Sequence, residues 1–122
     1  MERIVRRVNA LNSLVFIQDS KHWVVPDIDG EGAFWATDTC VALSCLPDCD
    51  GKTEIVLSER DDPPANLIFL TEVKLTIPSR KLAIELVPHR RIAEADIKST
   101  STMLAIWTDG HQATEKIFIK VR

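Results

Sequence analysis

The sequence predicts an all-β protein, an antiparallel β-sandwich of about seven to eight short strands with room for one short helix. Short runs in which apolar and polar residues alternate recur along the chain, and turn residues such as Pro, Asp and Gly separate them. Strands at this spacing, with few helical segments, are typical of a sandwich or a small barrel. At 122 residues, the chain is expected to form a single domain, residues 1–122, around one core.

Two segments are candidates for helix. In 2-ERIVRRVNAL-11 the apolar residues form one stripe of a helix, but a strand that begins at Val5 fits the same residues. The segment 90-RRIAEADI-97 follows Pro88, a residue well placed to begin a helix. One or two helical turns are therefore expected there.

The middle of the chain predicts two strands joined by a turn. In 39-TCVALSC-45 larger apolar side chains alternate with small ones, as in a strand that is covered on both faces. The turn 47-PDCDGK-52 leads to the alternating segment 53-TEIVLSER-60, and the three together predict a hairpin. The double proline 63-PP-64 then ends strand pairing, because proline cannot donate to a ladder.

The C-terminal half alternates most clearly. The segments 72-EVKLTI-77 and 81-KLAIELV-87 predict two strands joined by a tight corner. The segments 103-MLAIWT-108 and 115-EKIFIKV-121 flank 109-DGHQAT-114 and predict a second hairpin. The inward positions of all these strands are aliphatic, which leaves little room for a ligand between the sheets.

Charge is distributed unevenly along the chain, although the net charge is only −3. Residues 27–62 contain ten acidic residues against two basic ones, near −8, whereas the remainder has eight against thirteen, near +5. An acidic face attracts a basic partner and repels nucleic acid, so no nucleic-acid partner is expected. The alternative is that acidic residues simply gather in solvated turns.

The densest acidic stretch, 26-PDIDGEG-32, looks at first like the start of a calcium loop. Its glycines fall at the fourth and sixth positions counted from Asp27, and the residues that follow read as a strand where the calcium motif needs a helix. Glycine and aspartate are also favoured in turns. We therefore expect an acid-tipped loop, with no metal and no cofactor.

The three cysteines do not indicate a reactive or metal-binding site. Cys40 and Cys45 fall on opposite faces of the predicted strand, so they cannot readily converge on one zinc ion. Cys49 lies between Asp48 and Asp50, whose negative charges suppress the thiolate that a nucleophile needs. No catalytic residue is predicted, and a protein that is not an enzyme is favoured.

The N-terminus and the cysteine count indicate a cytoplasmic protein with no membrane association. The N-terminal apolar run, 14-LVFI-17, is four residues long, too short for a signal peptide or a membrane span. An odd number of cysteines fits a reducing compartment better than a disulfide framework.

The order of the predicted segments has a counterpart in a known family. The segments concerned are 14-LVFIQDSKHWVV-25, 32-GAFWATDTCVALS-44, 53-TEIVLSE-59, 72-EVKLTIP-78 and 104-LAIW-107. In kind and order they resemble the competence-J family of bacterial proteins, the DNA-entry nuclease inhibitors. The resemblance implies an antiparallel β-sandwich and a non-catalytic protein that binds a nuclease or a related toxin. It transfers no binding residue.

Charge and resemblance lead to one functional hypothesis, an inhibitor or immunity-type protein that binds a basic protein such as a nuclease or toxin. A nuclease needs a basic groove for its polyanionic substrate, and carboxylates on an inhibitor can lie where phosphates would. Trp35, just after the acidic loop, would be an apolar anchor. The residues predicted to attract the partner are Asp27, Asp29, Glu31, Asp48 and Asp50.

Two alternatives stay open. The first is a small enzyme or small-molecule binder with a pocket between the sheets. The second is a homo-oligomer such as a homodimer, in which the apolar segment from Ile4 to Leu11 covers a neighbour.

Overall fold

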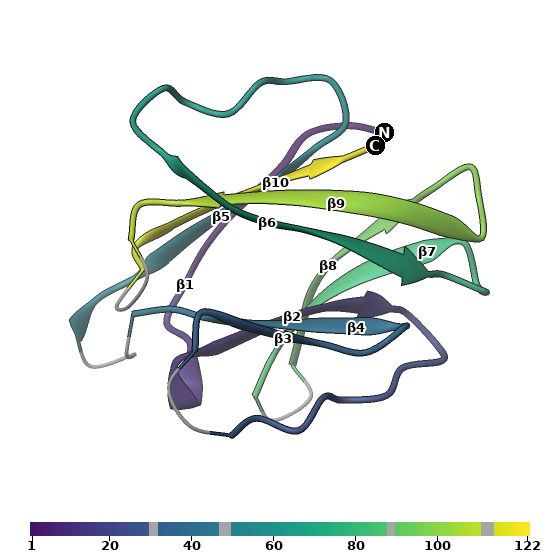
Figure 1. The fold of residues 1–122 in the computed structure, drawn as a ribbon, viewed down its shortest axis with the longest axis horizontal. Helices are drawn as coiled ribbons and strands as arrows, with labels where there is room; N and C mark the ends of the chain where they lie inside the picture. The colour runs from purple at the N-terminus through teal and green to yellow at the C-terminus, as the bar shows by residue number, and fades with distance from the viewer. Residues whose placement is uncertain (30–31, 47–49, 88–89, 111–113) are drawn as a thin grey trace.

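Two five-stranded β-sheets packed face to face make up the fold (Figure 1). This computed structural model describes residues 1–29, 32–46, 50–87, 90–110 and 114–122. The predicted all-β sandwich is confirmed, but the described residues form ten strands where about seven to eight were expected. The additional strands come from the two segments for which helix had been considered and from a short edge strand.

The first sheet has a mixed strand order. Its strands, in spatial order, are β1 (Ile4–Val8), β5 (Thr53–Ser58), β10 (Lys116–Val121), β9 (Ser101–Thr108) and β6 (Ile68–Thr76). The β5–β10 pair is parallel, and the other three pairs are antiparallel. The predicted hairpin near the C-terminus is confirmed, because β9 and β10 pair with Ile117 opposite Thr108.

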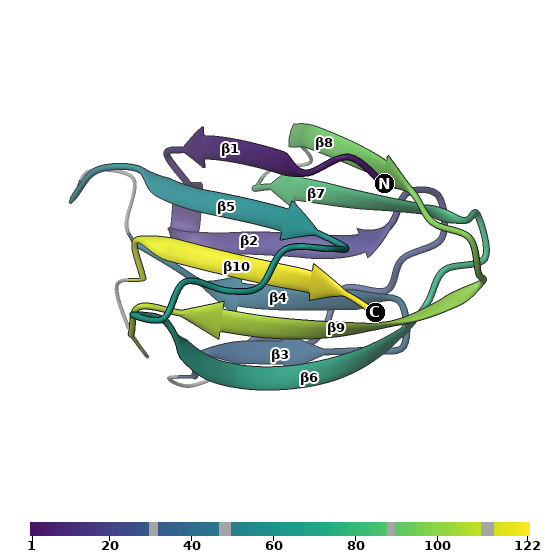
Figure 2. The same ribbon diagram turned by 90° about the horizontal axis from the view of Figure 1, so that it is seen from above.

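The second sheet is antiparallel throughout. Its strands, in spatial order, are β3 (Phe34–Ala36), β4 (Cys40–Ser44), β2 (Leu14–Asp19), β7 (Lys81–Leu86) and β8 (Arg90–Asp96). A single 3-10 turn, η1 (Leu11–Ser13), connects β1 in one layer to β2 in the other. Seen from above, the strands of the first sheet lie over those of the second (Figure 2).

Aliphatic side chains from both inner faces fill the space between the sheets. They come from alternate positions of the strands, as the period-two pattern predicts. Burial of these apolar side chains away from water is the main favourable contribution to the packing of the two sheets. The largest fully buried side chains among the described residues are Ile17, Leu43, Ile55, Leu57, Leu75, Ile77, Leu82, Ile84, Leu104, Ile106, Ile117 and Ile119.

Both helical candidates are strands, so those helix predictions were wrong. Residues 4–8 form β1, which pairs with β5 along the sheet edge, as the alternative strand interpretation allowed. Residues 90–96 form β8, in which the buried Ala93 and Ala95 alternate with exposed acidic residues. Alanine and arginine favour helices locally, but pairing with β7 and burial of the alanines override that preference.

The hairpin predicted from residues 39–60 was also wrong, because its two strands belong to different sheets. Both edges of β4 are occupied, by β2 and by β3. The chain leaves the second sheet at Leu46, whose backbone N–H donates to the carbonyl of Thr114 at 2.9 Å, and crosses to the first sheet. The loop is long enough to span the roughly 10 Å between packed sheets.

Each sheet has a loop across its outer face (Figures 1 and 2). Residues 59–67, here called the proline loop, cross the first sheet above β10. Residues 20–29, here called the cover segment, run along the outer side of the second sheet. In the described parts of the chain, no helix is long and apolar enough to cross a membrane.

Candidate functional site

The cover segment follows directly after Asp19, a buried residue at the end of β2. Its Oδ2 accepts hydrogen bonds from the backbone N–H groups of Lys21 (3.0 Å) and His22 (2.7 Å), and its Oδ1 accepts from Ser79 N (3.0 Å) and Oγ (2.7 Å). Burial by itself raises the pKa of Asp19, but these four bonds outweigh it and hold the pKa below its ordinary value. The ionised carboxylate thus fixes the direction in which the chain leaves the sheet.

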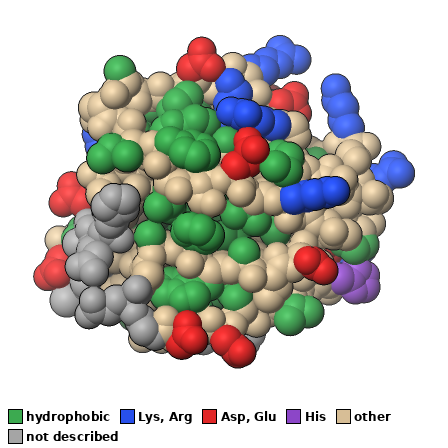
Figure 3. Space-filling model, in the orientation of Figure 1, with side chains coloured by type: hydrophobic (Ala, Val, Ile, Leu, Met, Phe, Trp, Pro, Cys, Tyr) green, Lys and Arg blue, Asp and Glu red, His purple; other side chains and the backbone are tan. Residues whose placement is uncertain are grey.

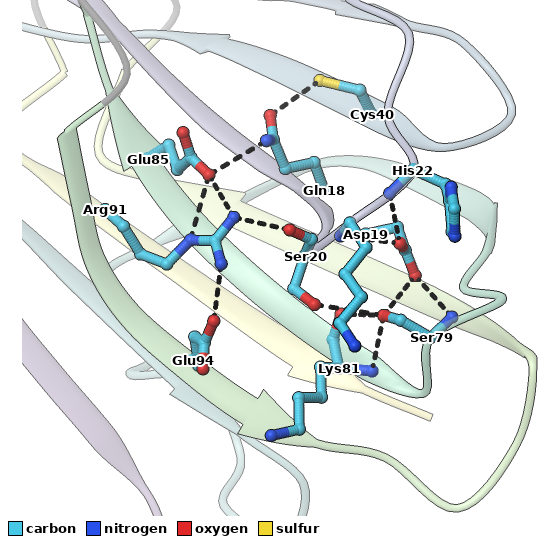
Figure 4. A network of polar contacts seen from close by, with 11 residues as sticks. Gln18, Asp19, Ser20, His22, Cys40, Ser79, Lys81, Glu85, Arg91 and Glu94 are labelled. Carbon is cyan, nitrogen blue, oxygen red and sulfur yellow. Dashed lines mark hydrogen bonds and ion pairs between the residues drawn. The ribbon is translucent and has the colours of Figure 1, made fainter.

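A charged network lies under the cover segment, on the outer face of the second sheet (Figure 4). Glu85, in β7, is 5% exposed. Its Oε2 accepts from Gln18 Nε2 (3.1 Å) and from Arg91 Nε (3.0 Å) and Nη2 (2.6 Å). Arg91 also donates to Glu94 Oε1 (2.6 Å) and to the carbonyl of Ser20 (2.7 Å), which belongs to the cover segment.

The position of this network follows from an irregularity in strand pairing. The register of β7 and β8 shifts between Ile84 and Glu85, and this shift places Glu85 opposite Arg91. The hydrogen bond from Glu85 is the main reason that the pKa of Arg91 is raised above its ordinary value. A buried carboxylate is tolerated only with such a partner, because an isolated charge is costly to remove from water.

Both described cysteines are buried, as predicted: Cys40 is the first residue of β4, and Cys45, directly after β4, belongs to the core between the sheets. The Cys40 thiol faces outward and donates to Gln18 Oε1 at 3.6 Å. Burial, with a smaller contribution from Glu85, raises the pKa of Cys40 to about 12, and burial raises that of Cys45 to about 11. Neither thiol therefore ionises near neutral pH. Cys49 lies outside the described residues.

An apolar pocket of about 230 Å³ lies between the cover segment and the sheet. Two polar side chains of the network, Gln18 and Glu85, form part of its lining. Trp23 and Val25, which are 36% and 48% exposed, mark where it meets the surface. The remaining lining residues are Phe16, Leu86 and Val87.

Three of the predicted partner-binding residues belong to this side of the molecule. Asp27 and Asp29 are exposed on the cover segment, and within the described chain neither forms an ion pair. Trp35 is half-buried in β3, and its Nε1 donates to the carbonyl of Asp29 at 3.3 Å. The structure therefore brings Trp35 and the backbone of the acidic loop together.

The other predicted residues belong to a second loop or cannot be placed. Asp50 is exposed in the β4–β5 loop, which lies at the same end of the sandwich as the end of the cover segment (Figures 1 and 2). Glu31 and Asp48 lie outside the described residues. A shared acidic edge made by the two loops stays a prediction.

Ion pairs neutralise much of the acidic middle segment. Four of its carboxylates pair with basic groups from the two ends of the chain: Glu54 with Arg7, Glu59 with the N-terminal amine, Asp61 with Arg3, and Asp62 with Lys120. On the side seen in Figure 3, Lys and Arg side chains gather at the upper right, whereas Asp and Glu side chains are spread over the top, the left side and the lower margin. The uneven distribution of charge along the sequence therefore produces only a partly uneven distribution of charge on the surface.

Sequence reasoning missed the network of Gln18, Glu85 and Arg91. One signal was available, because Glu85 interrupts an aliphatic strand whose neighbour on the same face is the small residue Ala83. A carboxylate at such a position needs a buried partner. The partner could not be identified, because residues 90–97 were expected to be helical. Among the described residues, no group of three or more His, Cys, Asp or Glu side chains is arranged to hold a metal ion.

The architecture defines the class of protein, a two-layered β-sandwich with loop-covered outer faces and a fold like that of the competence-J inhibitors. In its fold the chain is similar to one solved structure in particular, the crystal structure of ComJ, inhibitor of the DNA degrading activity of NucA, from Bacillus subtilis, with a TM-score of 0.72 and 11% sequence identity. The match covers 97% of this chain and 93% of that one. No family model and no curated protein matches the sequence. The likeness confirms the fold that the resemblance implied.

Proposed function

We propose that this protein is a non-catalytic inhibitor that binds a nuclease and blocks its access to DNA. The observation that carries the proposal is the match to ComJ, an inhibitor of a DNA-degrading enzyme, over nearly the full length of both chains. A likeness confined to a few strands would be expected of many sandwiches, because one fold hosts many functions. Here the match covers 97% of this chain and 93% of that chain.

Electrostatics supports the same proposal. A nuclease that binds DNA exposes a basic groove, and an inhibitor gains association rate and selectivity when it presents carboxylates to that groove. Asp27 and Asp29 are exposed and have no ion pair in the described chain, whereas Asp61 and Asp62 are held by Arg3 and Lys120. We place the surface that meets the nuclease on the side of the cover segment, with Trp35 beside it.

A DNA-degradation assay tests the proposal. NucA and a panel of other sequence-nonspecific nucleases would be incubated with plasmid DNA and increasing amounts of this protein, with ComJ as a positive control and an unrelated acidic protein of similar charge as a negative control. We expect DNA cleavage by at least one nuclease to stop near a one-to-one ratio. If ComJ inhibits NucA while a hundredfold excess of this protein inhibits no nuclease of the panel, the proposal is wrong.

A further inference from the structure

The two oxygens of the Glu85 carboxylate have different surroundings. Its Oε2 accepts three hydrogen bonds, yet nothing among the described residues donates to Oε1, which points away from Arg91 (Figure 4). The Glu85 side chain is only 7% exposed, and it lines the apolar pocket under the cover segment. Among the described residues no buried side-chain nitrogen or oxygen lacks a hydrogen-bond partner, so Oε1 reaches solvent, and a donor that entered the pocket would take the place of water there.

The charges around the pocket favour a cation. Glu85 and Glu94 share one guanidinium, that of Arg91, so the three side chains together carry one excess negative charge. The pocket walls include the aromatic rings of Phe16 and Trp23, and aromatic faces attract cations. A cation that entered would both meet the unpaired oxygen and balance the charge.

The size of the pocket indicates what kind of group it accepts. Pockets for drug-sized ligands usually measure about 300–1,000 Å³, whereas this one is about 230 Å³, which is nearer the size of one long side chain. A single free oxygen also suits an ammonium group better than a guanidinium, which prefers to bind two oxygens at once. The aliphatic stem of a lysine would lie against the apolar walls.

We propose that this pocket receives a lysine side chain of the nuclease partner, whose ammonium group donates to Glu85 Oε1 while Phe16 and Trp23 enclose its stem. The inference rests on the proposed function, because it takes the partner to be a basic protein. It adds a single anchoring contact to the general attraction by exposed acidic residues. Anchors of this kind, seated in a desolvated pocket, commonly dominate the affinity of a protein interface.

Neighbouring valines provide a matched pair of variants. Val25 lines the pocket, whereas Val24 is 64% exposed and is absent from its lining. Val25→Lys and Val24→Lys add the same charge one residue apart, so they weaken general attraction to a basic partner equally. Only the lysine at 25 can fill the pocket and bind Glu85 from within. We expect Val25→Lys to weaken nuclease binding about 30-fold or more, and Val24→Lys less than about threefold.

A second measurement tests the pocket without the nuclease. Butylammonium, which mimics the end of a lysine side chain, would be titrated into the protein while the indole N–H signal of Trp23 is followed by NMR. We expect a saturable shift at millimolar concentrations in the wild type and in Val24→Lys, and none in Val25→Lys. Butanol, which has the same chain without the charge, should shift the signal far less.

The two measurements separate the pocket from the function. If the protein inhibits a nuclease but Val25→Lys and Val24→Lys weaken nuclease binding equally, the pocket proposal is wrong and the proposed function stands. A charge-selective shift with butylammonium but no inhibition of any nuclease overturns the function and shows a cation site of another use. Equal responses to butanol and butylammonium overturn the role of Glu85, whatever the nuclease assay gives.

Discussion

The outer faces of the two sheets differ in composition: the first is apolar, whereas the second holds charged side chains. On the first sheet an apolar row crosses the strands, in which Phe69 stacks edge-on against Trp107 at 5.4 Å and Trp107 against Phe118 at 6.2 Å. Phe118 is 2% exposed and lies opposite Val56 on the next strand. On the second sheet the corresponding layer contains Phe16 together with the charged network of Glu85 and Arg91.

The difference agrees with the proposal that the nuclease meets the second sheet, while the first face mainly stabilises the fold. Burial of an apolar row stabilises a fold wherever area is removed from water, and aromatic pairs add to it. A buried ion pair contributes little net stability, and well-packed apolar residues can often replace it. The loops differ in the same sense: ion pairs to Arg3 and Lys120 hold the carboxylates of the proline loop, whereas Asp27 and Asp29 of the cover segment are exposed and have no ion pair in the described chain.

The largest effect is expected on the apolar face. Phe118→Ala removes a buried ring and should lower the free energy of unfolding by about 3–5 kcal/mol, measured by urea denaturation. Phe69→Ala removes a ring from the same row, but Phe69 is 53% exposed at the sheet edge, so its loss should cost about 1 kcal/mol. Equal losses from the two variants would mean that the row does not stabilise the face by burial.

A smaller loss is expected on the polar face, with a different signature. Arg91→Met leaves Glu85 buried without its cation and should cost about 2–3 kcal/mol, less than for a fully enclosed pair because a third of the Arg91 side chain is exposed. Arg90→Met, at the exposed neighbouring position, should change stability by less than about 0.5 kcal/mol.

The double variant Arg91→Met with Glu85→Leu distinguishes a charge effect from lost packing. Removing both charges should restore most of the stability that Arg91→Met loses, because an apolar pair avoids the desolvation cost. No such rescue exists on the apolar face, where losses should simply add. A double variant less stable than Arg91→Met would show that Glu85 stabilises the fold by contacts other than its ion pair.

The third prediction concerns pH and the start of the cover segment. The pKa of Asp19 is lowered in the folded state, so the unfolded state binds a proton more readily and the stabilisation is lost as pH falls. Asp19→Asn should cost about 2 kcal/mol near neutral pH. That difference from the wild type should shrink below the ordinary value of 3.8, as the wild-type carboxylate is protonated. Urea denaturation at pH 7, 5 and 3 measures it.

Asp27→Asn provides the control for this titration. Asp27 is exposed and unpaired in the described chain, so its substitution should change stability little at any of these pH values. A difference between wild type and Asp19→Asn that stays constant from pH 7 to pH 3 would mean that shape, and not charge, holds the cover segment.

The two faces also differ in how far sequence alone could predict them. The period-two pattern located the inner face of most strands, because alternate aliphatic residues can be buried only on one side of a sheet. It could not assign strands to sheets: residues 40–44 and 53–58 follow each other in the chain but belong to different layers. The sheet that a strand joins depends on which strand edges are free to pair, and this cannot be predicted from the local sequence.

The candidate site was predicted only in part for a similar reason. Asp27, Asp29 and Trp35 could be singled out by composition, since acidic turns and tryptophans are visible in the sequence. The pairing of Glu85 with Arg91 depends on a register shift between two strands, one of which had been expected to be a helix. Likewise, the ion pairs that neutralise Asp61 and Asp62 join residues nearly sixty positions apart.

The smallest effect is expected from the exposed carboxylates, and it bears on the nuclease rather than on stability. The double variants Asp27→Asn with Asp29→Asn and Asp61→Asn with Asp62→Asn each remove two negative charges. If the cover segment faces a basic partner, the first should slow association about three- to tenfold at low ionic strength, and the second should slow it less. At about 1 M salt, where screening acts within about 3 Å, the first variant should approach the wild type.

Association rates from stopped-flow or surface-based kinetics, measured with the nuclease found by the degradation assay, decide this point. Dissociation rates should change little in either variant, because rim charges act mainly on encounter. If both double variants slow association equally, the partner senses only the net charge of the molecule, and the cover segment has no special part in recognition. If the Asp61 and Asp62 variant has the larger effect, the partner instead meets the face under the proline loop, and the assignment of the two faces is reversed.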